Sequence, residues 1–152
     1  MKDKDSGTPR VFLVRHGQTE WSQNGRYTGD TELDLTAEGR QQVLGSAQVV
    51  VGHGNLIDPA KLACVFVSPR QRAQQTSHLL FGDTLSQASA DKVQVTTTTE
   101  LAEWDYGAYE GLTTQEIHAL RREHGLDSER QWDIWQDGCE DGEYGASGLR
   151  LA

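Results

Sequence analysis

Two short apolar runs on either side of an amphipathic stretch constrain the fold of this chain more than any other feature. Residues 11–14 and 62–67 are rich in β-branched and aromatic side chains, which is typical of strands covered on both faces, as parallel strands usually are. Between them, Thr36 offers an N-cap, and apolar residues recur at helical spacing from Val43 to Gly52. Strand, helix and strand in this order predict a right-handed βαβ unit, and therefore an α/β fold with a mostly parallel sheet.

The residues that follow these two strands are expected to meet at one edge of the sheet. Arg15 and His16 come directly after the first strand, and Arg70 and Arg72 come after the second, where a helix is predicted to begin and to run to Gly82. The carboxyl ends of parallel strands share an edge, and open α/β sheets bind ligands there. Free N–H groups at a helix N-terminus also favour anions. The pattern indicates a site for an anionic substrate; the alternative is a set of ordinary solvated or turn residues.

The second half of the chain predicts one more strand, a loop and a helix. Residues 81–91 are predicted to be a mobile linker, and residues 92–97 alternate with period two, as in a half-exposed strand near a sheet edge. Residues 101–111 are dense in aromatic and acidic side chains without helical periodicity, which indicates an ordered loop. Thr113 is predicted to begin a helix with a capping box, and Gly125 is predicted to end it.

Composition limits the classes of function. With 152 residues the chain is long enough for one domain, expected over residues 10–152 after a disordered tail at residues 1–9. The net charge of -9 argues against nucleic acid or an anionic membrane as a partner. No run suits a membrane span or a signal peptide, so we expect a cytoplasmic protein, with the nucleus as a second location. Cys64 lies in an apolar run and Cys139 in a polar loop, which predicts one buried and one exposed thiol rather than a disulfide.

Five motifs in sequence order resemble the histidine phosphatase superfamily, in its phosphoglycerate mutase-like branch. They are LVRHGQTEW (13–21), YTG (27–29), LDLTAEG (33–39), SPRQRA (68–73) and EWDYGAYEG (103–111). Within the superfamily, residues 110–113 and 132–140 are most similar to the fungal sedoheptulose-1,7-bisphosphatases. The resemblance implies a three-layer α/β/α fold and a phosphatase that acts through a phosphohistidine without metal or cofactor. The implied partner is a small phosphorylated sugar, such as sedoheptulose 1,7-bisphosphate; the oligomeric state is not implied.

The resemblance also assigns catalytic roles to individual residues. It makes His16 the nucleophile that accepts the phosphoryl group. Arg15 and Arg72 match the arginines that clamp the phosphate, whose forked donors suit its oxygens. Glu103 matches the general acid that protonates the leaving alcohol and then activates water. The positions that line the substrate pocket in the family, besides these two arginines, match Ser22, Thr28 and Tyr106.

Some assignments stay open at this point. Arg70 stands where many relatives carry an apolar residue, so only a contact with substrate is assigned to it. Asp105 and Glu110 rival Glu103 as the acid, because the composition of the loop does not choose among three carboxylates. The alternatives in function are a mutase that returns the phosphate to a bound product, and a non-catalytic phosphate binder.

The family's pocket also uses a second histidine, which follows a later central strand. This chain stops at Ala152 before such a motif, so we expect an incomplete version of a larger enzyme, with an incomplete C-terminal part of the fold. His53 imitates the motif, but its apolar neighbours continue a helical stripe, which predicts a helix-terminal turn. His78, His118 and His124 are predicted to be solvated residues in or at the end of helices.

Overall fold

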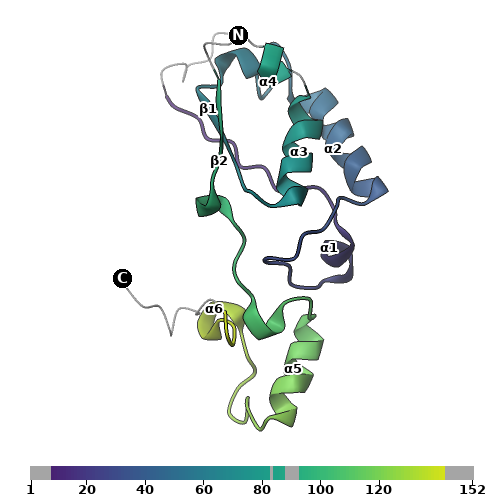
Figure 1. The fold of residues 1–152 in the computed structure, drawn as a ribbon, viewed down its shortest axis with the longest axis vertical. Helices are drawn as coiled ribbons and strands as arrows, with labels where there is room; N and C mark the ends of the chain where they lie inside the picture. The colour runs from purple at the N-terminus through teal and green to yellow at the C-terminus, as the bar shows by residue number, and fades with distance from the viewer. Residues whose placement is uncertain (1–7, 83, 88–92, 143–152) are drawn as a thin grey trace.

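The predicted α/β fold is confirmed by a computed structural model, which describes residues 8–82, 84–87 and 93–142 (Figure 1). The elements in chain order are α1 (Glu20–Asn24), α2 (Ala37–Val50), the 3-10 turn η1 (Pro59–Lys61), β1 (Cys64–Val67), α3 (Gln71–Phe81), α4 (Thr84–Gln87), β2 (Gln94–Thr97), the 3-10 turns η2 (Thr99–Leu101) and η3 (Gly107–Tyr109), α5 (Thr114–Glu123) and α6 (Ile134–Asp137). The predicted tail at residues 1–9 lies mostly outside the described residues.

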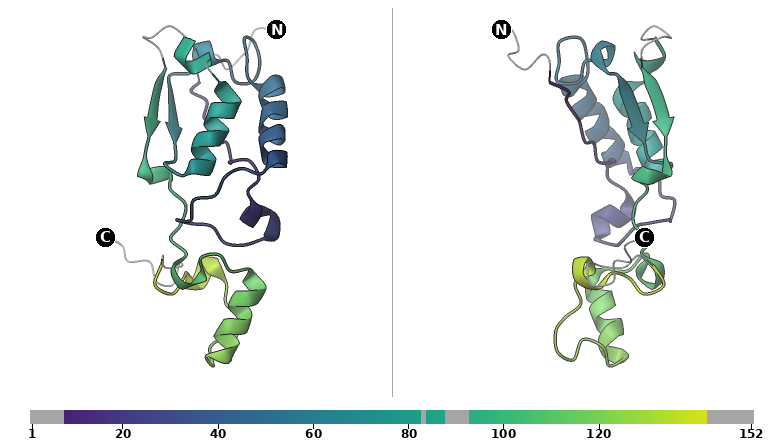
Figure 2. Two further views of the ribbon diagram at one scale, coloured as in Figure 1. Left: turned by 45° about the vertical axis from the view of Figure 1, so that its right-hand side comes forward. Right: turned by 90° about the vertical axis from the view of Figure 1, so that its left-hand side faces the viewer.

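Among the described residues the sheet consists of two parallel strands, which form a βαβ unit with α3 instead of the unit predicted within residues 11–67. β1 pairs with β2 in a register that places Cys64 opposite Gln94 and Val67 opposite Thr97. Helix α3 connects the two strands and packs against β1, and α2 packs against α3. Both helices therefore lie on the same side of the sheet, with α2 in the outer position (Figure 2).

Residues 11–14 do not form the predicted strand. Val11 and Leu13 are 83% and 93% exposed, and only Phe12 packs against the hydrophobic cluster beneath it. A strand is defined by backbone hydrogen bonds to a neighbour. Within the described part of the chain β1 and β2 pair only with each other, so this extended segment has no ladder to join. The expectation that the strands are covered on both faces is also wrong, because Phe66 of β1 is 58% exposed.

The predicted helix starts are confirmed. The Thr36 side chain accepts the Gly39 N–H at 2.9 Å at the start of α2. At α5, Thr113 and Glu116 form the predicted capping box, in which the Glu116 carboxylate accepts the Thr113 N–H at 2.7 Å. The expectation of a mobile linker over residues 81–91 is corrected in part, because Phe81 ends α3 and residues 84–87 form α4; residues 83 and 88–91 lie outside the described residues.

Two hydrophobic clusters stabilise the described chain, one under the sheet and one around α5. The first contains Leu35, Val43, Ile57, Leu80 and Phe81, and the second contains Tyr109, Ile117, Trp132 and Cys139. The cysteines are the reverse of the prediction: Cys64 is exposed on the open face of β1, whereas Cys139 packs against Trp132. Neither forms a disulfide.

The two clusters are joined where residues 26–31 run beside residues 110–113. Tyr27 donates its backbone N–H to Leu112 at 2.9 Å, and its carbonyl accepts the Gly111 N–H at 2.9 Å. This pairing brings the loop that follows the first motif to the loop that contains the carboxylates.

None of the helices in the described residues is long and apolar enough to cross a bilayer.

Candidate active site

His16 is held by its own backbone and by the two helices behind it. Its Nδ1 lies 2.8 Å from the carbonyl oxygen of Gly17, which can only accept, so Nδ1 carries the proton and Nε2 has the free lone pair. Gly17 in turn donates its N–H to the Thr76 hydroxyl of α3 at 3.0 Å. A Cβ on Gly17 would lie 2.8 Å from Val43 Cγ2 and 3.0 Å from the Gly39 carbonyl, so only glycine allows this close approach to α2. The tautomer of the imidazole is therefore fixed, with the lone pair on Nε2.

The environment of His16 favours the neutral form of its imidazole. Its pKa is lowered by burial first and then by the positive charges of Arg72 and Arg15, whereas the Gly17 carbonyl and the Glu103 carboxylate act in the opposite direction. The charges of Arg15, Arg72 and Glu103 thus all influence one ring, so the residues to which the resemblance assigns catalysis lie within range of charge interactions with His16. The chain order had predicted this for Arg15, His16 and Arg72, but not for Glu103.

Arg72 is buried, with 2% of the residue exposed. Its guanidinium donates to the carbonyl oxygens of Thr28 at 3.1 Å, Gly29 at 3.0 Å and Thr31 at 3.1 Å. Burial lowers the pKa of Arg72, and Glu103 opposes this shift. A guanidinium has more N–H donors than these three bonds use, so donors remain for an anion.

Arg15 differs from Arg72 because it is exposed and makes no hydrogen bond or ion pair with another described residue. It borders a hollow of about 190 Å³ between α2 and α3, lined by Val14, Arg15, Gly17, Gln42, Val43, Ser46, Thr76 and Leu80. His16, Arg72 and Glu103 do not line this hollow, and Arg15 is its one charged side chain. We therefore do not assign this hollow as the substrate pocket.

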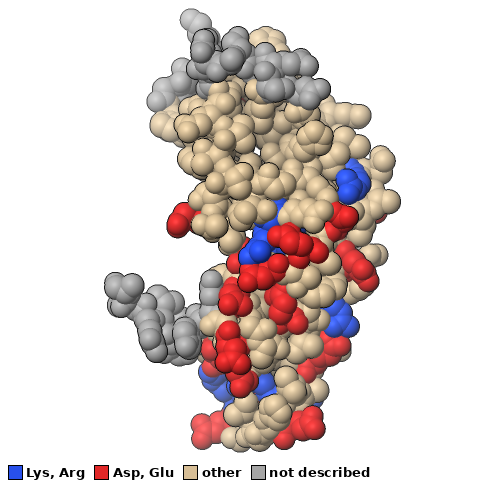
Figure 3. All heavy atoms as spheres, in the orientation of Figure 1, with Lys and Arg blue, Asp and Glu red and all other residues tan. Residues whose placement is uncertain are grey.

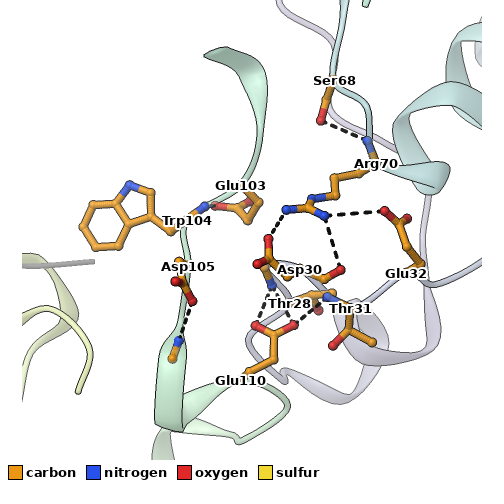
Figure 4. Close-up of polar contacts among 12 residues, drawn as sticks. Thr28, Asp30, Thr31, Glu32, Ser68, Arg70, Glu103, Trp104, Asp105 and Glu110 are labelled. Carbon is orange, nitrogen blue, oxygen red and sulfur yellow. Dashed lines mark hydrogen bonds and ion pairs between the residues drawn. The ribbon is translucent and has the colours of Figure 1, made fainter. Parts of the chain in front are cut away.

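The three rival carboxylates of the loop are engaged differently (Figure 4). Glu103 accepts the Trp104 N–H at 3.0 Å and the Tyr106 hydroxyl at 3.3 Å through one oxygen, Oε1. Asp105 accepts the N–H of Gly107, two residues on, at 2.9 Å in a local turn. Glu110 accepts hydrogen bonds from the backbone N–H groups of Gly29 and Thr31, and both of its carboxylate oxygens take part. Of these three carboxylates, Glu103 is the one whose charge is among the main influences on the pKa of His16.

The residues predicted to line the substrate pocket have different positions. Tyr106 lies beside Glu103, and burial, followed by the charge of that carboxylate, raises the pKa of its phenol. Thr28 lies beside Arg72 and accepts a hydrogen bond from its guanidinium through the backbone carbonyl. The Ser22 hydroxyl is engaged with Thr19 in the cap of α1, accepting the Thr19 N–H at 2.8 Å and donating to the Thr19 carbonyl at 2.9 Å. The assignment of Ser22 is therefore the weakest of the three.

Arg70 is neutralised by two acidic residues that the sequence reasoning did not single out. It forms an ion pair with Asp30, and its Nη1 lies 3.6 Å from Glu32 (Figure 4). Asp30 and Glu32 are the first and third residues after the YTG motif, and that spacing was the available signal. With its charge matched in this way, Arg70 is a poorer phosphate ligand than Arg72 or Arg15.

The other histidines differ in exposure. His53 is in the turn after α2, as predicted, with a side chain that is 97% exposed and 3.4 Å from Asp58. His78 and His124 are exposed, as predicted. The prediction for His118 is wrong, because its ring is half-buried against Trp132 and its Nε2 lies 3.1 Å from the Trp132 carbonyl. No group of three or more His, Cys, Asp or Glu among the described residues is arranged to hold a metal ion.

The protein's surface charge gives context to these cations. On the face in Figure 3, acidic side chains gather around α5 and α6 and where that half meets the sheet, with a few basic side chains among them. The chain has 23 acidic residues against 14 lysines and arginines. Binding of an anion here would depend on local arginines rather than on a broad basic surface.

Comparisons with known proteins agree with the motifs. The model of the histidine phosphatase superfamily (branch 1) matches residues 11–147. The sedoheptulose 1,7-bisphosphatase of Saccharomyces cerevisiae is 47% identical over 146 residues, which are 95% of this chain and 54% of that protein. An acid phosphatase of Mycobacterium tuberculosis is 42% identical, over 88% of this chain and 55% of that protein. Among solved structures, the alpha-ribazole phosphatase of Shigella flexneri matches with a TM-score of 0.63 at 26% identity, over 86% of this chain and 57% of that one. The chain spans about half the length of the curated relatives that it matches.

Proposed function

We propose, from the premise that this chain belongs to the histidine phosphatase superfamily, that it hydrolyses a phosphate monoester through a phosphohistidine on His16. The observation that carries the proposal is the state of the His16 ring. Nδ1 donates its proton to the Gly17 carbonyl, burial lowers the pKa of the ring, and the charges of Arg15, Arg72 and Glu103 also influence that pKa. A neutral imidazole with a free Nε2 beside two arginines suits attack on phosphorus.

The reaction has two displacements at the same phosphorus atom. In the first, His16 Nε2 forms an N–P bond while the P–O bond to the alcohol breaks, and Glu103 gives its proton to the leaving oxygen. In the second, Glu103 takes a proton from water, the water oxygen bonds to phosphorus, and the N–P bond breaks to return neutral His16 and release phosphate. The two arginines stabilise the charge that develops on the phosphoryl oxygens in both steps.

We propose a sugar bisphosphate, such as sedoheptulose 1,7-bisphosphate, as the substrate. Support comes from the yeast relative of that name, which matches nearly the whole of this chain, and from the motifs at residues 110–113 and 132–140. The acid phosphatase among the relatives also supports hydrolysis of phosphate esters.

The role of Glu103 provides the test of this proposal. Glu103→Gln removes the transferable proton, so hydrolysis of an alkyl phosphate, whose leaving group needs protonation, should fall by about 100-fold or more. Attack of His16 on p-nitrophenyl phosphate should fall much less, because its phenolate leaves without a proton. Because Glu103 also activates water in the second step, which both substrates share, the comparison uses the first turnover; equal losses there on both substrates would contradict the assignment of Glu103.

Product analysis of the wild-type protein separates the alternatives. Stoichiometric inorganic phosphate supports the phosphatase, whereas an isomer of the substrate without free phosphate would identify a mutase. Stabilisation by phosphate esters without any turnover would leave a phosphate-binding protein.

A further inference from the structure

The turn at residues 28–31 is held from opposite sides by two charged side chains. The Glu110 carboxylate accepts the Gly29 N–H at 2.8 and 3.0 Å and the Thr31 N–H at 3.0 Å. The Arg72 guanidinium donates to the carbonyl oxygens of Thr28, Gly29 and Thr31 at 3.0–3.1 Å. Every one of these six contacts uses a backbone group of the same short turn, and Figure 4 shows Glu110 beneath it.

This arrangement couples the two charges through one peptide group. In the peptide group that joins Thr28 and Gly29, the N–H donates to the Glu110 carboxylate and the C=O accepts from the Arg72 guanidinium, so this dipole is aligned between an anion and a cation. Hydrogen bonds in such a chain polarise and strengthen one another. The Glu110 charge also raises the pKa of Arg72, although burial outweighs it. Glu110 therefore fixes the carbonyls that, in turn, fix the orientation of Arg72.

The same turn packs against the loop that contains Glu103. A Cβ on Gly29 would lie 2.2 Å from the Trp104 carbonyl, 3.0 Å from Glu110 Oε2 and 3.1 Å from Tyr106 Cδ2. Backbone thus touches backbone one residue after Glu103. Glu110 belongs to that loop as well, so its carboxylate links the loop with the acid to the turn that holds the arginine.

We infer that Glu110 is a positioning residue, which sets Arg72 for phosphate binding through the turn at residues 28–31 and does not itself transfer a proton. The inference rests on the proposed function in one respect, namely that Arg72 contacts the phosphoryl group. The second glutamate of the EWDYGAYEG motif, Glu110, thus has a different role from the first, Glu103.

Affinity for inorganic phosphate tests the inference without depending on turnover. Titration calorimetry would compare the wild-type protein with Glu110→Gln, Arg72→Lys and the double variant. Glu110→Gln keeps the shape of the side chain, but it loses the charge and one acceptor oxygen, so phosphate should bind about tenfold more weakly. Because Glu110 acts through Arg72, the double variant should bind no more weakly than Arg72→Lys alone.

A matched control comes from the same loop. Asp105→Asn also removes one negative charge, yet its amide oxygen can still accept the Gly107 N–H, so phosphate affinity should equal that of the wild type. Melting temperature identifies variants that fail to fold. If Glu110→Gln is one of them, Glu110→Asp, which keeps the charge on a shorter side chain, takes its place and should also weaken binding.

The possible results separate this inference from the proposed function. If the wild-type protein binds no phosphate, the proposed function fails and the inference fails with it. If the wild type binds phosphate and the folded Glu110 variant binds it equally well, or if the double variant shows additive losses, the inference alone is overturned. A loss of turnover in Glu110→Gln that is larger on alkyl phosphates than on p-nitrophenyl phosphate would also overturn it, since that pattern belongs to an acid.

Discussion

Arg72 and Arg15 should differ in what they contribute to stability, although both are assigned to the phosphate. Arg72→Ala removes three charged hydrogen bonds to the turn at residues 28–31, all at 3.0–3.1 Å and centred on a residue that is 2% exposed. Arg15→Ala removes an exposed side chain without such bonds to described residues. The pair is therefore a matched test of a buried and an exposed arginine in one site.

The size of the effect follows from those bonds. Hydrogen bonds to charged groups contribute about 1.5–3 kcal/mol each. The full sum is not lost on truncation, because desolvation of the buried guanidinium opposes folding and water can reach some of the freed carbonyls. We expect Arg72→Ala to lower the free energy of unfolding by about 2–4 kcal/mol, and Arg15→Ala by about 0.5 kcal/mol or less. For a chain of this length the first value corresponds to a melting temperature lower by roughly 4–16 °C.

Urea unfolding at constant pH, with and without inorganic phosphate, measures the free energy of unfolding of each variant and the stabilisation that phosphate adds. Each variant should lose the stabilisation that phosphate gives the wild type, but only Arg72→Ala should be destabilised in its absence. Equal stability of the two variants without phosphate would refute the reasoning, because it would mean that the bonds from Arg72 to the turn contribute nothing in solution.

Three further predictions concern the nucleophile, the turn and the second cluster. Since burial lowers the pKa of His16, the acid limb of the pH profile of kcat/KM should lie below the ordinary histidine value of 6.5, and an acid limb at or above 6.5 would contradict this. The contribution of His16 to the free energy of unfolding should also decline as the pH falls through 6.5, because the unfolded chain then binds the proton more readily than the folded chain. Gly29→Ala should weaken phosphate binding in calorimetry, because its Cβ would clash with the Trp104 carbonyl and displace the turn; unchanged affinity would show that the turn does not set Arg72. Ile117→Ala, at a fully buried position, should cost about 2–5 kcal/mol in urea unfolding, and a loss below about 1 kcal/mol would mean that the second cluster is loosely packed.

Local signals in the sequence predicted the helices well. The capping box of Thr113 and Glu116 and the N-cap of Thr36 involve residues three positions apart, so the pattern contains the whole interaction. Such helix signals depend on local periodicity, which a single sequence shows. His16 and Arg72 were predicted to be close because of a strand at residues 11–14 that the structure does not form; the bond from the Gly17 N–H to the Thr76 hydroxyl nevertheless holds this segment beside α3.

Features that depend on distant partners could not be predicted. Residues 11–14 have the composition of a strand, but strand formation depends on a neighbour, and none pairs with them in the described chain. Cys139 lies in a polar stretch, yet it is buried because Trp132 covers it. The bonds from Glu110 to Gly29 and Thr31 join residues about 80 positions apart, so the motif could present Glu110 only as a rival acid.

The most direct test of the account is to trap the phosphoenzyme. Rapid quenching of the protein with a ³²P-labelled sugar bisphosphate, followed by peptide mapping, should locate an acid-labile, base-stable phosphoramidate on Nε2 of His16. The label should be absent from His16→Ala. Label that persists in His16→Ala, or phosphate release by the wild type that continues in that variant at an undiminished rate, would contradict the proposal that His16 is the nucleophile.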